Sequence, residues 1–380
     1  MIIGVLKETR KNEARAALSL DTAKKIIALK HELIIEEGAG LASFINDADY
    51  ASVGVKVVDR KEVFNATLIL MVNAMPEIDF QYLKPNHVLV GMLEPFNKEL
   101  TQNFANKKVT AFALEALPRN TRAQIMDVLS SQANIAGYKA VVLAANTYKK
   151  FMPMLMTAAG TVKAARVMIL GAGVAGLQAI ATAKRLGAVV EASDVRPSVK
   201  EQIESLGAKF IDVPYETDEE QQAALGEGGY AKAMPASWLT RQAKLVAEKA
   251  EQADIIITSA LIPGREPPIL INAETVMKMK AGSVIVDMAA GQAKNGSGNC
   301  PLTKANETIV ENGVTIIGNT NLASELSSDA TLLYARNIFE FIKLLFDENN
   351  SFTINLEDEL ISGSLLTTDG QIKKMGIYYG

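Results

Sequence analysis

Short runs of apolar and β-branched residues alternate with stretches of helical periodicity along almost the whole chain. In the first third, the runs that predict strands are IIGVL, ELIIEE, ATLILMV, HVLVGML and VTAFAL. In the middle third they are ARVMIL, AVVEAS, KFIDV, ADIIIT, SVIVDM and VTIIG. Strands that alternate with helices predict parallel sheets covered on both faces. Two such series predict an α/β protein with two doubly wound, Rossmann-like domains.

Two long helical stretches, residues 123–149 and 324–346, are placed to link the two series. A chain that leaves a domain through one helix and returns through another makes that domain discontinuous. We therefore expect an α/β domain from residues 1–128 plus 324–380 and a dinucleotide-binding domain from residues 129–323. The shorter helix in SLDTAKKIIALK is expected to be capped by Ser19 or Asp21.

One stretch departs from this alternation. After KFIDV, the sequence ETDEEQQAALGEGGYAKAMPASWLT is polar and glycine-rich, and it exceeds the ordinary connection length of about 2–6 residues. We expect a long loop here, with Tyr230 beside two glycines. A functional lid and a solvated surface loop are both consistent with this pattern.

Composition and charge narrow the class of protein. The chain has 380 residues, of which 48% are hydrophobic and 22% charged, and a formal net charge of −4. This is typical of a globular protein, and without a basic block nucleic acid is not an expected partner. No apolar stretch reaches the ~20 residues that a membrane-spanning helix needs. We expect a chain that does not cross a membrane but can dock on a protein that does.

Few residues offer reactive side chains. Cys300 is the one cysteine, which excludes a disulfide within the chain and predicts a small buried side chain. His31 lies in the helical stretch ALKHELII, and His87 precedes a predicted strand, at the amino end of its sheet. We interpret both histidines as structural, and no histidine-based metal site is expected.

The most informative motif is VMILGAGVAGLQAIATAKRLGAVVEASDVR, which begins at Val167. A predicted strand leads into Gly171, Gly173 and Gly176, a helix follows, and a second strand ends at Asp194. In dinucleotide-binding domains the first glycine allows a tight turn, the second lets the backbone approach the pyrophosphate, and the third lets the helix pack on the strand. The helix N-terminus offers N–H groups to phosphate. The motif predicts a dinucleotide site; another adenosine ligand or a decayed site kept for packing is the competing interpretation.

Asp194 bears on the choice of dinucleotide. Its carboxylate can accept hydrogen bonds from both hydroxyls of the adenosine ribose and would repel a 2′-phosphate, which favours NAD over NADP. Arg196 weakens that inference, because a nearby arginine can accommodate the phosphate.

Two later strands end before residues 259–261 and at Asp287, where the chain can border a ligand or simply pack.

A second cluster lies in EALPRNTRAQIMDVLSSQANIAGYKAV, which is dense in hydrogen-bonding groups and has no histidine or cysteine. Oxidation of an alcohol or amine needs a general base, whereas hydride exchange between two nicotinamides needs ring orientation and exclusion of water. Gln124, Asp127 and Ser130 are three residues apart and are predicted to share one face of a helix. They can hold a carboxamide while Arg119 reaches ribose or phosphate. A polar, solvated helix start is the alternative.

Long segments of the chain resemble a known family. They are PRNTRAQIMDVLSSQANIAGYKAV, the glycine motif, KEQIESLGAKF, GGYAKAM, DIIITSALIPG, GSVIVDMAA, GNCPLT and KETRKNEARAAL. The chain resembles the NAD(H)-binding component, domain I, of proton-translocating NAD(P) transhydrogenase, within the alanine dehydrogenase/transhydrogenase superfamily. The similarity covers essentially the whole chain. It implies direct hydride transfer from NADH to NADP⁺ on a partner subunit, coupled to proton movement through a membrane subunit.

The resemblance also implies roles for individual residues. Those expected around the nicotinamide and in catalysis are Arg119, Gln124, Asp127, Ser130 and Tyr230. Those expected to bind the rest of NAD(H) are Gly171, Gly173, Val174, Gly176, Asp194, Val195, Arg196, Gly229, Gln242 and Leu261. In the family, Gly229 and Tyr230 belong to a mobile loop that closes over NAD(H).

The resemblance implies partners as well. They are a membrane-embedded proton-carrying subunit, an NADP(H)-binding subunit and a second copy of the chain. The expected location is the cytoplasm, in peripheral association with the inner membrane, as in the split bacterial form of the enzyme.

The main rival with the same fold is alanine dehydrogenase. Its pattern shares an arginine in the motif NE.R.AL, matched by Arg15, but requires a lysine and a histidine where this chain has Met71, Asn73 and Glu94. A 2-keto acid would lose its cationic clamp and its acid/base partner. A non-catalytic NAD-binding subunit is a further alternative.

One departure from the preferred family is DMAAGQAKNGSGNC, which is longer and richer in glycine than usual.

Overall fold

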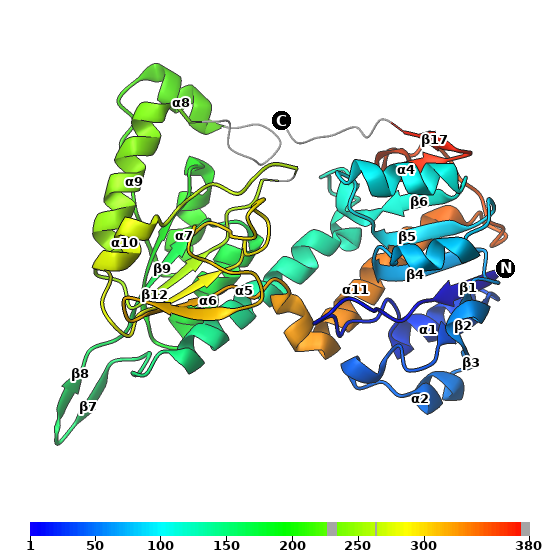
Figure 1. Ribbon diagram of the computed structural model, residues 1–380, viewed down its shortest axis with the longest axis horizontal. Helices are drawn as coiled ribbons and strands as arrows, with labels where there is room; N and C mark the ends of the chain where they lie inside the picture. The colour runs from blue at the N-terminus through cyan, green and yellow to red at the C-terminus, as the bar shows by residue number, and fades with distance from the viewer. Residues whose placement is uncertain (226–233, 263, 374–380) are drawn as a thin grey trace. The chain divides into compact units, whose positions relative to one another are not determined.

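The computed structural model describes residues 1–225, 234–262 and 264–373, and the chain divides into two compact units (Figure 1). Among the described residues, unit 1 comprises residues 1–132 and 323–373, and unit 2 comprises those between Ala133 and Leu322. The first boundary falls within the long helix α5, Val128–Thr147. Each unit is built on its own sheet. The predicted fold class, two doubly wound α/β sheets, is confirmed.

The sheet of unit 1 has the strand order β17-β16-β6-β5-β4-β1-β2-β3. β1 to β6 are parallel, and β16 and β17 extend the edge in antiparallel pairs. The order β3-β2-β1-β4-β5-β6 is typical of dinucleotide-binding sheets. The strands are β1 Ile2–Val5, β2 Glu32–Glu36, β3 Lys56–Val58, β4 Leu68–Asn73, β5 Val88–Met92, β6 Thr110–Ala113, β16 Leu365–Thr368 and β17 Gln371–Ile372.

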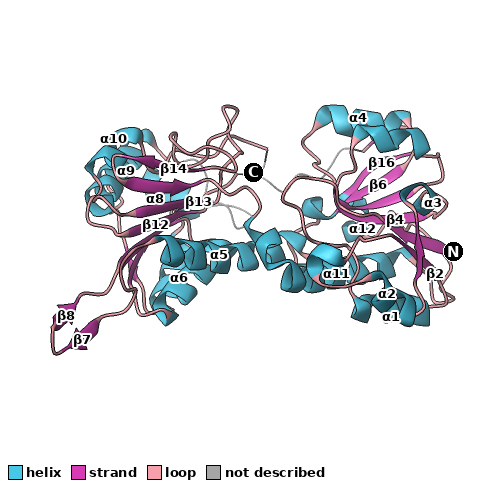
Figure 2. Cartoon of the chain, turned by 60° about the horizontal axis from the view of Figure 1, so that its bottom comes forward, coloured by secondary structure: helices cyan, strands magenta, loops and turns pink. Residues whose placement is uncertain are grey.

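Helices cover both faces of this sheet, and the alternation of side chains along a strand explains why (Figure 2). In β4, Leu68 and Leu70 belong to the core that includes α1 and α11, whereas Ile69 belongs to the core that includes α3 and α4. Successive strand residues point to opposite faces, so a continuous apolar run needs cover on each. The helices are α1 Leu20–Ala28, α2 Asp47–Ser52, α3 Arg60–Val63, α4 Lys98–Asn106, α11 Ser327–Ile342 and α12 Glu359–Ser364, with 3₁₀ turns η1 Leu41–Ser43, η2 Glu77–Tyr82, η3 Leu114–Ala116, η4 Gln124–Met126, η6 Leu322–Leu326 and η7 Lys343–Leu345.

Unit 2 repeats the same plan. Its sheet order is β11-β10-β9-β12-β13-β15-β14, parallel except for β14. Val167 of β9 packs in the core that includes α5 and α6, and Met168 packs in the core that includes α9 and α10. The elements are β9 Arg166–Leu170, α6 Val174–Arg185, β10 Val189–Ser193, η5 Pro197–Val199, α7 Lys200–Ser205, β11 Lys209–Phe210, α8 Asp218–Leu225, α9 Ala236–Ala250, β12 Ile255–Thr258, α10 Ala273–Lys278, β13 Val284–Asp287, β14 Thr308–Glu311 and β15 Val314–Ile317.

A separate hairpin projects from unit 2 (Figure 1). Its strands, β7 Leu155–Thr157 and β8 Gly160–Val162, pair only with each other in the sheets of the described chain, and every residue in them is exposed. The hairpin lies in the apolar run FMPMLMTAAGTV, residues 151–162, which is shorter than the ~20 residues of a membrane span. Each helix in the described part of the chain is too short or too polar to span a lipid bilayer.

Several local predictions were wrong. His31 is not in a helix: α1 ends at Ala28, and His31 directly precedes β2, buried and stacked on Phe346. The predicted strand KFIDV is reduced to Lys209–Phe210. The helix predicted from residue 123 begins at Val128, after the 3₁₀ turn η4. Other local predictions were confirmed: Ser19 caps α1, and Cys300 is buried.

The stretch predicted as one long loop is partly helical. It contains α8 and the start of α9. The carboxylate of Glu220 accepts hydrogen bonds from Glu216 N at 2.8 Å and Ser237 Oγ at 2.9 Å, and it forms an ion pair with Arg241 at 2.7 Å. These bonds join α8 to α9, which the local sequence pattern does not reveal. Gly229 and Tyr230 lie outside the described residues.

Candidate functional site

The dinucleotide motif occupies the point in unit 2 where the sheet reverses its direction of winding. From β9 the strand order runs to β10 on one side and to β12 on the other. Ligands of doubly wound sheets bind at such a point, outside the carboxyl ends of the strands. Gly171 follows β9, Asp194 follows β10 and Ser259 follows β12.

The glycines of the motif are needed for different reasons. Gly171 has φ +94°, and a Cβ there would lie 2.9 Å from Ser259 Oγ. A Cβ on Gly176 would lie 1.9 Å from the carbonyl oxygen of Gly171. A Cβ on Gly173 would meet nothing within 4 Å. Gly171 and Gly176 are therefore required by the fold itself, whereas Gly173 keeps an open space at the start of α6.

That open space suits a phosphate group. Gly173 is the N-cap of α6 and has no side chain with which to cap the first turn. The N–H groups at a helix N-terminus and the helix dipole attract anions. Val174, the first residue of the helix, is 40% exposed beside it. The residues present thus fit the pyrophosphate of a dinucleotide.

Asp194 is almost fully engaged within the protein. Its Oδ2 accepts a hydrogen bond from Ala172 N at 2.8 Å, and its two oxygens accept hydrogen bonds from Arg196 Nε and Nη2, each at 3.0 Å. The Asp194 side chain is 7% exposed. The aspartate therefore fixes the glycine loop and holds Arg196 at once.

Other predicted residues lie around these strand ends. Gln242, on α9, places Nε2 3.4 Å from the hydroxyl of Ser193, the residue before Asp194. Val195 packs against the small core formed around Trp238. Leu261 is 47% exposed, beyond the turn that follows β12.

Asn299 supports this turn and was missed by the sequence analysis. Its Oδ1 accepts a hydrogen bond from Ala260 N at 3.1 Å, and its Nδ2 donates to Ala260 O at 2.9 Å and Pro268 O at 2.8 Å. It is fully buried. Its only sequence signal was its place in the segment GNCPLT, which does not reveal a contact 39 residues away.

Asp287 has a structural task. Its carboxylate accepts hydrogen bonds from the backbone N–H groups of Ala289, Asn299 and Cys300 and from the hydroxyls of Thr258 and Thr303. It is fully buried. These hydrogen bonds hold the extended, glycine-rich run that follows β13 against the carboxyl end of that strand.

The second predicted cluster lies in unit 1, in the segment that leads into α5. Gln124, Asp127 and Ser130 do not share a helix face, as the spacing had predicted: Gln124 is in η4, Asp127 is extended, and only Ser130 is in α5. The Asp127 carboxylate accepts hydrogen bonds from Ser130 N at 2.9 Å and Ser130 Oγ at 2.5 Å. Asp127 thereby caps α5, because its side chain satisfies an N–H group of the first turn. Arg119 and Gln124 are exposed.

Neighbouring polar residues anchor this segment. Arg122 Nη2 bonds to Asp358 Oδ2 at 2.7 Å, and Asn120 Nδ2 bonds to Glu359 Oε1 at 2.9 Å. Ser131 Oγ donates to Asn337 Oδ1 at 2.7 Å. The polar groups of the segment thus divide into those held by the protein and those, such as Gln124, that face solvent.

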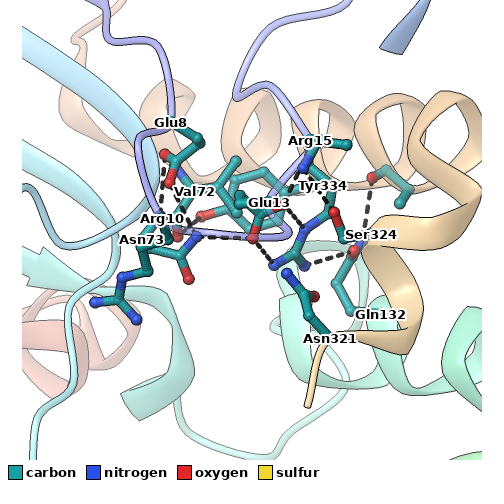
Figure 3. Close-up of polar contacts among 12 residues, drawn as sticks. Glu8, Arg10, Glu13, Arg15, Val72, Asn73, Gln132, Asn321, Ser324 and Tyr334 are labelled. Atoms are coloured by element: carbon teal, nitrogen blue, oxygen red, sulfur yellow. Dashed lines mark hydrogen bonds and ion pairs between the residues drawn. The ribbon is translucent and has the colours of Figure 1, made fainter. Parts of the chain in front are cut away.

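Arg15 lies in a buried polar network at the carboxyl ends of β1 and β4 (Figure 3). Its Nη2 lies 2.6 Å from Glu13 Oε2, its Nε lies 2.8 Å from Glu13 Oε1, and its Nη1 donates to Gln132 Oε1 at 2.9 Å. Asn73 Nδ2 donates to both Glu8 and Glu13, each at 2.9 Å. The guanidinium of Arg15 therefore already has a carboxylate partner.

The electrostatics of this network follow from burial and pairing. Burial by itself would raise the pKa of Glu13, but the hydrogen bonds and charge of Arg15 outweigh it and lower the pKa to about 2. Burial raises the pKa of Glu8, against the hydrogen bonds from Asn73. Burial likewise raises the pKa of Glu115 to about 7, although Glu94 N donates to its carboxyl at 2.7 Å. The site is acidic.

A cavity of about 350 Å³ opens beside this network and is lined by residues that follow β1, β4 and β5. Glu94, in the position where alanine dehydrogenase is expected to carry histidine, lines it and forms an ion pair with Arg10. The lining also includes Glu77 and Glu99. Within the described ranges, no group of three or more His, Cys, Asp and Glu side chains is arranged to hold a metal ion.

Comparison with known families covers both units. A family model described as alanine dehydrogenase/PNT, N-terminal domain, matches residues 4–136. A second, described as alanine dehydrogenase/PNT, C-terminal domain, matches residues 140–375.

Individual relatives extend this match. The chain is 43% identical over 381 residues to the first part of NAD(P) transhydrogenase subunit alpha from Rhodospirillum rubrum, covering 98% of this chain and 97% of the relative. It is 40% identical over 379 residues to the protein of the same name in Rickettsia prowazekii, covering 98% and 96%. Alanine dehydrogenase 1 of Staphylococcus aureus is 26% identical over 387 residues, covering 99% and 96%.

Solved structures agree. The crystal structure of transhydrogenase from Sinorhizobium meliloti superposes with a TM-score of 0.87 at 41% identity, covering 98% of this chain and 100% of that one. An L-alanine dehydrogenase superposes with a TM-score of 0.81 at 24% identity, covering 100% and 98%, and shares the fold.

Proposed function

The chain belongs to the alanine dehydrogenase/PNT family, and from this premise we propose that it is the NAD(H)-binding component of an NAD(P) transhydrogenase. In this proposal NADH passes hydride directly to NADP⁺ held by a partner subunit. The observation that carries the choice within the family is that Met71, Asn73 and Glu94 stand where alanine dehydrogenase is expected to carry a lysine and a histidine. Without them a 2-keto acid would lack its cationic clamp and its acid/base partner, and three of the five N–H donors of Arg15 are already bound to Glu13 and Gln132.

The proposed contacts to the adenosine half of NAD(H) come from the glycine motif and Asp194. Gly171, Gly173, Val174 and Gly176 present the start of α6 to the pyrophosphate, and Gly173 leaves room for it. Asp194, with Val195 and Arg196, receives the adenosine ribose. The residues proposed to border the bound dinucleotide are Gln242 and Leu261, together with Gly229 and Tyr230 outside the described residues.

The nicotinamide is proposed to be oriented by Arg119, Gln124, Asp127 and Ser130. When bound, NADH supplies a hydride from its nicotinamide ring. The Gln124 amide offers both a donor and an acceptor, as a carboxamide requires, and Asp127 holds the Ser130 hydroxyl in one direction at 2.5 Å. Catalysis of this kind depends on holding the ring in a fixed pose, and no proton needs to be exchanged with these side chains.

The proposed partners follow from the same premise. Relatives named as one portion of subunit alpha support a complex of several subunits. We expect an NADP(H)-binding subunit and a membrane-embedded subunit through which proton movement is coupled to hydride transfer. The chain would then be cytoplasmic and associate peripherally with the inner membrane.

A second copy of the chain is the further proposed partner. The hairpin β7–β8 exposes Met154, Leu155, Met156 and Val162. An isolated two-stranded hairpin is at most marginally stable in water, and a group of exposed apolar side chains marks an interaction surface. A homodimer in which this hairpin packs on the partner would bury them.

The test is reconstitution with an NADP(H)-binding subunit of a transhydrogenase. NADH and the thionicotinamide analogue of NADP⁺, whose reduced form absorbs at a longer wavelength, report hydride transfer directly. We expect rapid transfer with the wild-type chain and a loss of about 100-fold in rate for Gln124→Ala, the order expected when a positioning contact is lost. Gln102→Ala, at an exposed glutamine of α4, is the matched control.

The outcomes separate the alternatives. Tight NADH binding without hydride transfer would identify a non-catalytic NAD-binding subunit. Formation of NADH from alanine and NAD⁺ by the chain alone would identify an amino-acid dehydrogenase. Either result overturns the proposal.

A further inference from the structure

Asn337, on α11, bonds to both sides of the segment that carries the proposed nicotinamide residues. Its Nδ2 donates to the carbonyl oxygen of Ile125 at 2.7 Å, and its Oδ1 accepts a hydrogen bond from Ser131 Oγ at 2.7 Å. The side chain is buried. Ile125 follows Gln124 in the chain, and Ser131 follows Ser130.

The backbone alone does not fix the distance between Gln124 and Ser130. η4 ends at Met126 and α5 begins at Val128, and Asp127 between them is extended, with φ −72° and ψ 91°. A continuous helix would lock these residues to each other, but a break of this kind leaves their spacing to tertiary contacts. The Asn337 amide supplies one contact on each side of the break.

Another residue already secures α5. Gln132 Nε2 donates to Ala330 O of α11 at 3.2 Å, and Gln132 Oε1 accepts from Arg15. The contact that depends on Asn337 is therefore the one to η4, which carries Gln124. Only a side chain with both a donor and an acceptor at this position can serve the carbonyl of Ile125 and the hydroxyl of Ser131 together.

We propose that Asn337 is a positioning residue for hydride transfer, which acts by holding η4 against the start of α5 and so fixes Gln124 relative to Asp127 and Ser130. The inference rests on the proposed function of these residues. It predicts a specific kinetic signature. Displacing an orienting group by about 1 Å costs up to 100-fold in rate, whereas the proposed adenosine contacts belong to unit 2 and do not involve Asn337.

The decisive variant is Asn337→Asp, which keeps the acceptor for Ser131 and removes the donor to Ile125. With the NADP(H)-binding subunit and the thionicotinamide analogue of NADP⁺, kcat is expected to fall at least about tenfold, while the Kd for NADH, measured by fluorescence titration, changes by less than about twofold. Ser131→Ala, which removes the other contact, is expected to give a smaller fall in kcat. Amide hydrogen exchange in residues 124–127 should become faster in Asn337→Asp.

The matched control is Ile338→Val, a buried change at the next residue of α11. It tests whether lost stability of the helix alone explains the effect. Equal kcat values for Asn337→Asp and Ile338→Val at comparable Tm, or a parallel loss of kcat and NADH affinity, would overturn the inference. A wild-type chain without hydride transfer would overturn the proposed function instead, and unchanged exchange in residues 124–127 of Asn337→Asp would independently refute the anchoring role.

Discussion

Arg15 and Glu13 form an ion pair in which Nη2 and Oε2 lie 2.6 Å apart and the two side chains are 6% and 1% exposed. A buried arginine needs such a partner, because an uncompensated charge in the interior costs several kcal/mol. The pair makes Arg15 part of the buried scaffold of unit 1. Glu94 lines the neighbouring cavity, in the position where alanine dehydrogenase is expected to carry a histidine.

The Glu13–Arg15 pair predicts a loss of stability in acid. The pKa of Glu13 is lowered to about 2 in the folded chain, from an ordinary value of 4.5, so its contribution is complete above about pH 4.5 and disappears as the pH falls toward 2. The shift corresponds to about 3 kcal/mol in the free energy of unfolding. Glu13→Gln should remove this component of the pH dependence and destabilise the chain by about 3–5 kcal/mol at pH 7.

Urea unfolding at several pH values measures this effect. The control is Asp21→Asn, which breaks the exposed ion pair with Lys25 and should change stability little. Equal effects of the two substitutions would contradict the assignment of Glu13 as a buried, ionised partner.

Glu115 predicts the opposite dependence on pH. Burial raises its pKa to about 7, so its favourable contribution is complete below about pH 4.5 and is lost as the pH rises through 7. Glu115→Gln, which keeps an oxygen to accept the hydrogen bond from Glu94 N, should flatten the stability profile between pH 5 and 8 by up to about 3 kcal/mol. Thermal unfolding across this range gives the measurement, with Glu32→Gln at an exposed position as the control. A slope that persists in Glu115→Gln would show that another group titrates.

The ion pair of Asp194 with Arg196 predicts the cofactor preference. Asp194→Ser removes the acceptor for the ribose hydroxyls and releases Arg196, which can then bind a 2′-phosphate. We expect the affinity for NADH to fall about tenfold or more and that for NADPH to rise. Fluorescence titration of both nucleotides tests this. In the double variant Asp194→Ser/Arg196→Gln the gain for NADPH should vanish; if it remains, Arg196 is not its source.

The hairpin β7–β8 predicts the state of association. Met156 is 73% exposed, so Met156→Lys should leave the fold of each chain intact and disrupt a dimer built on this surface. Sedimentation velocity should show a shift from dimer to monomer at micromolar concentration. Ile78→Lys, at a residue of unit 1 that is 72% exposed, should leave the sedimentation unchanged. A monomeric wild-type chain, or a dimer unaffected by Met156→Lys, would exclude the hairpin as the interface.

The local sequence pattern predicted the central strands of each sheet better than the edge strands. The strands β4 and β12 are apolar and buried along almost their whole length, as parallel strands covered on both faces require. The strands that the sequence analysis missed are short or at an edge, such as β3, where only Val58 is buried, and β14, where no residue is buried. Their pairing is decided by the neighbouring strand rather than by their own composition.

The amino-acid sequence by itself determined the central strands of both sheets, the glycine turn before α6 and the acid that follows β10, because each depends on residues that are close in the chain. The tertiary structure alone decided which polar groups serve the scaffold. Arg15 meets Gln132 across 117 positions, and Asn337 meets Ser131 across 206. A buried polar group must find a partner, but only the packing of the whole chain selects which one, and so which side chains are left to meet a ligand.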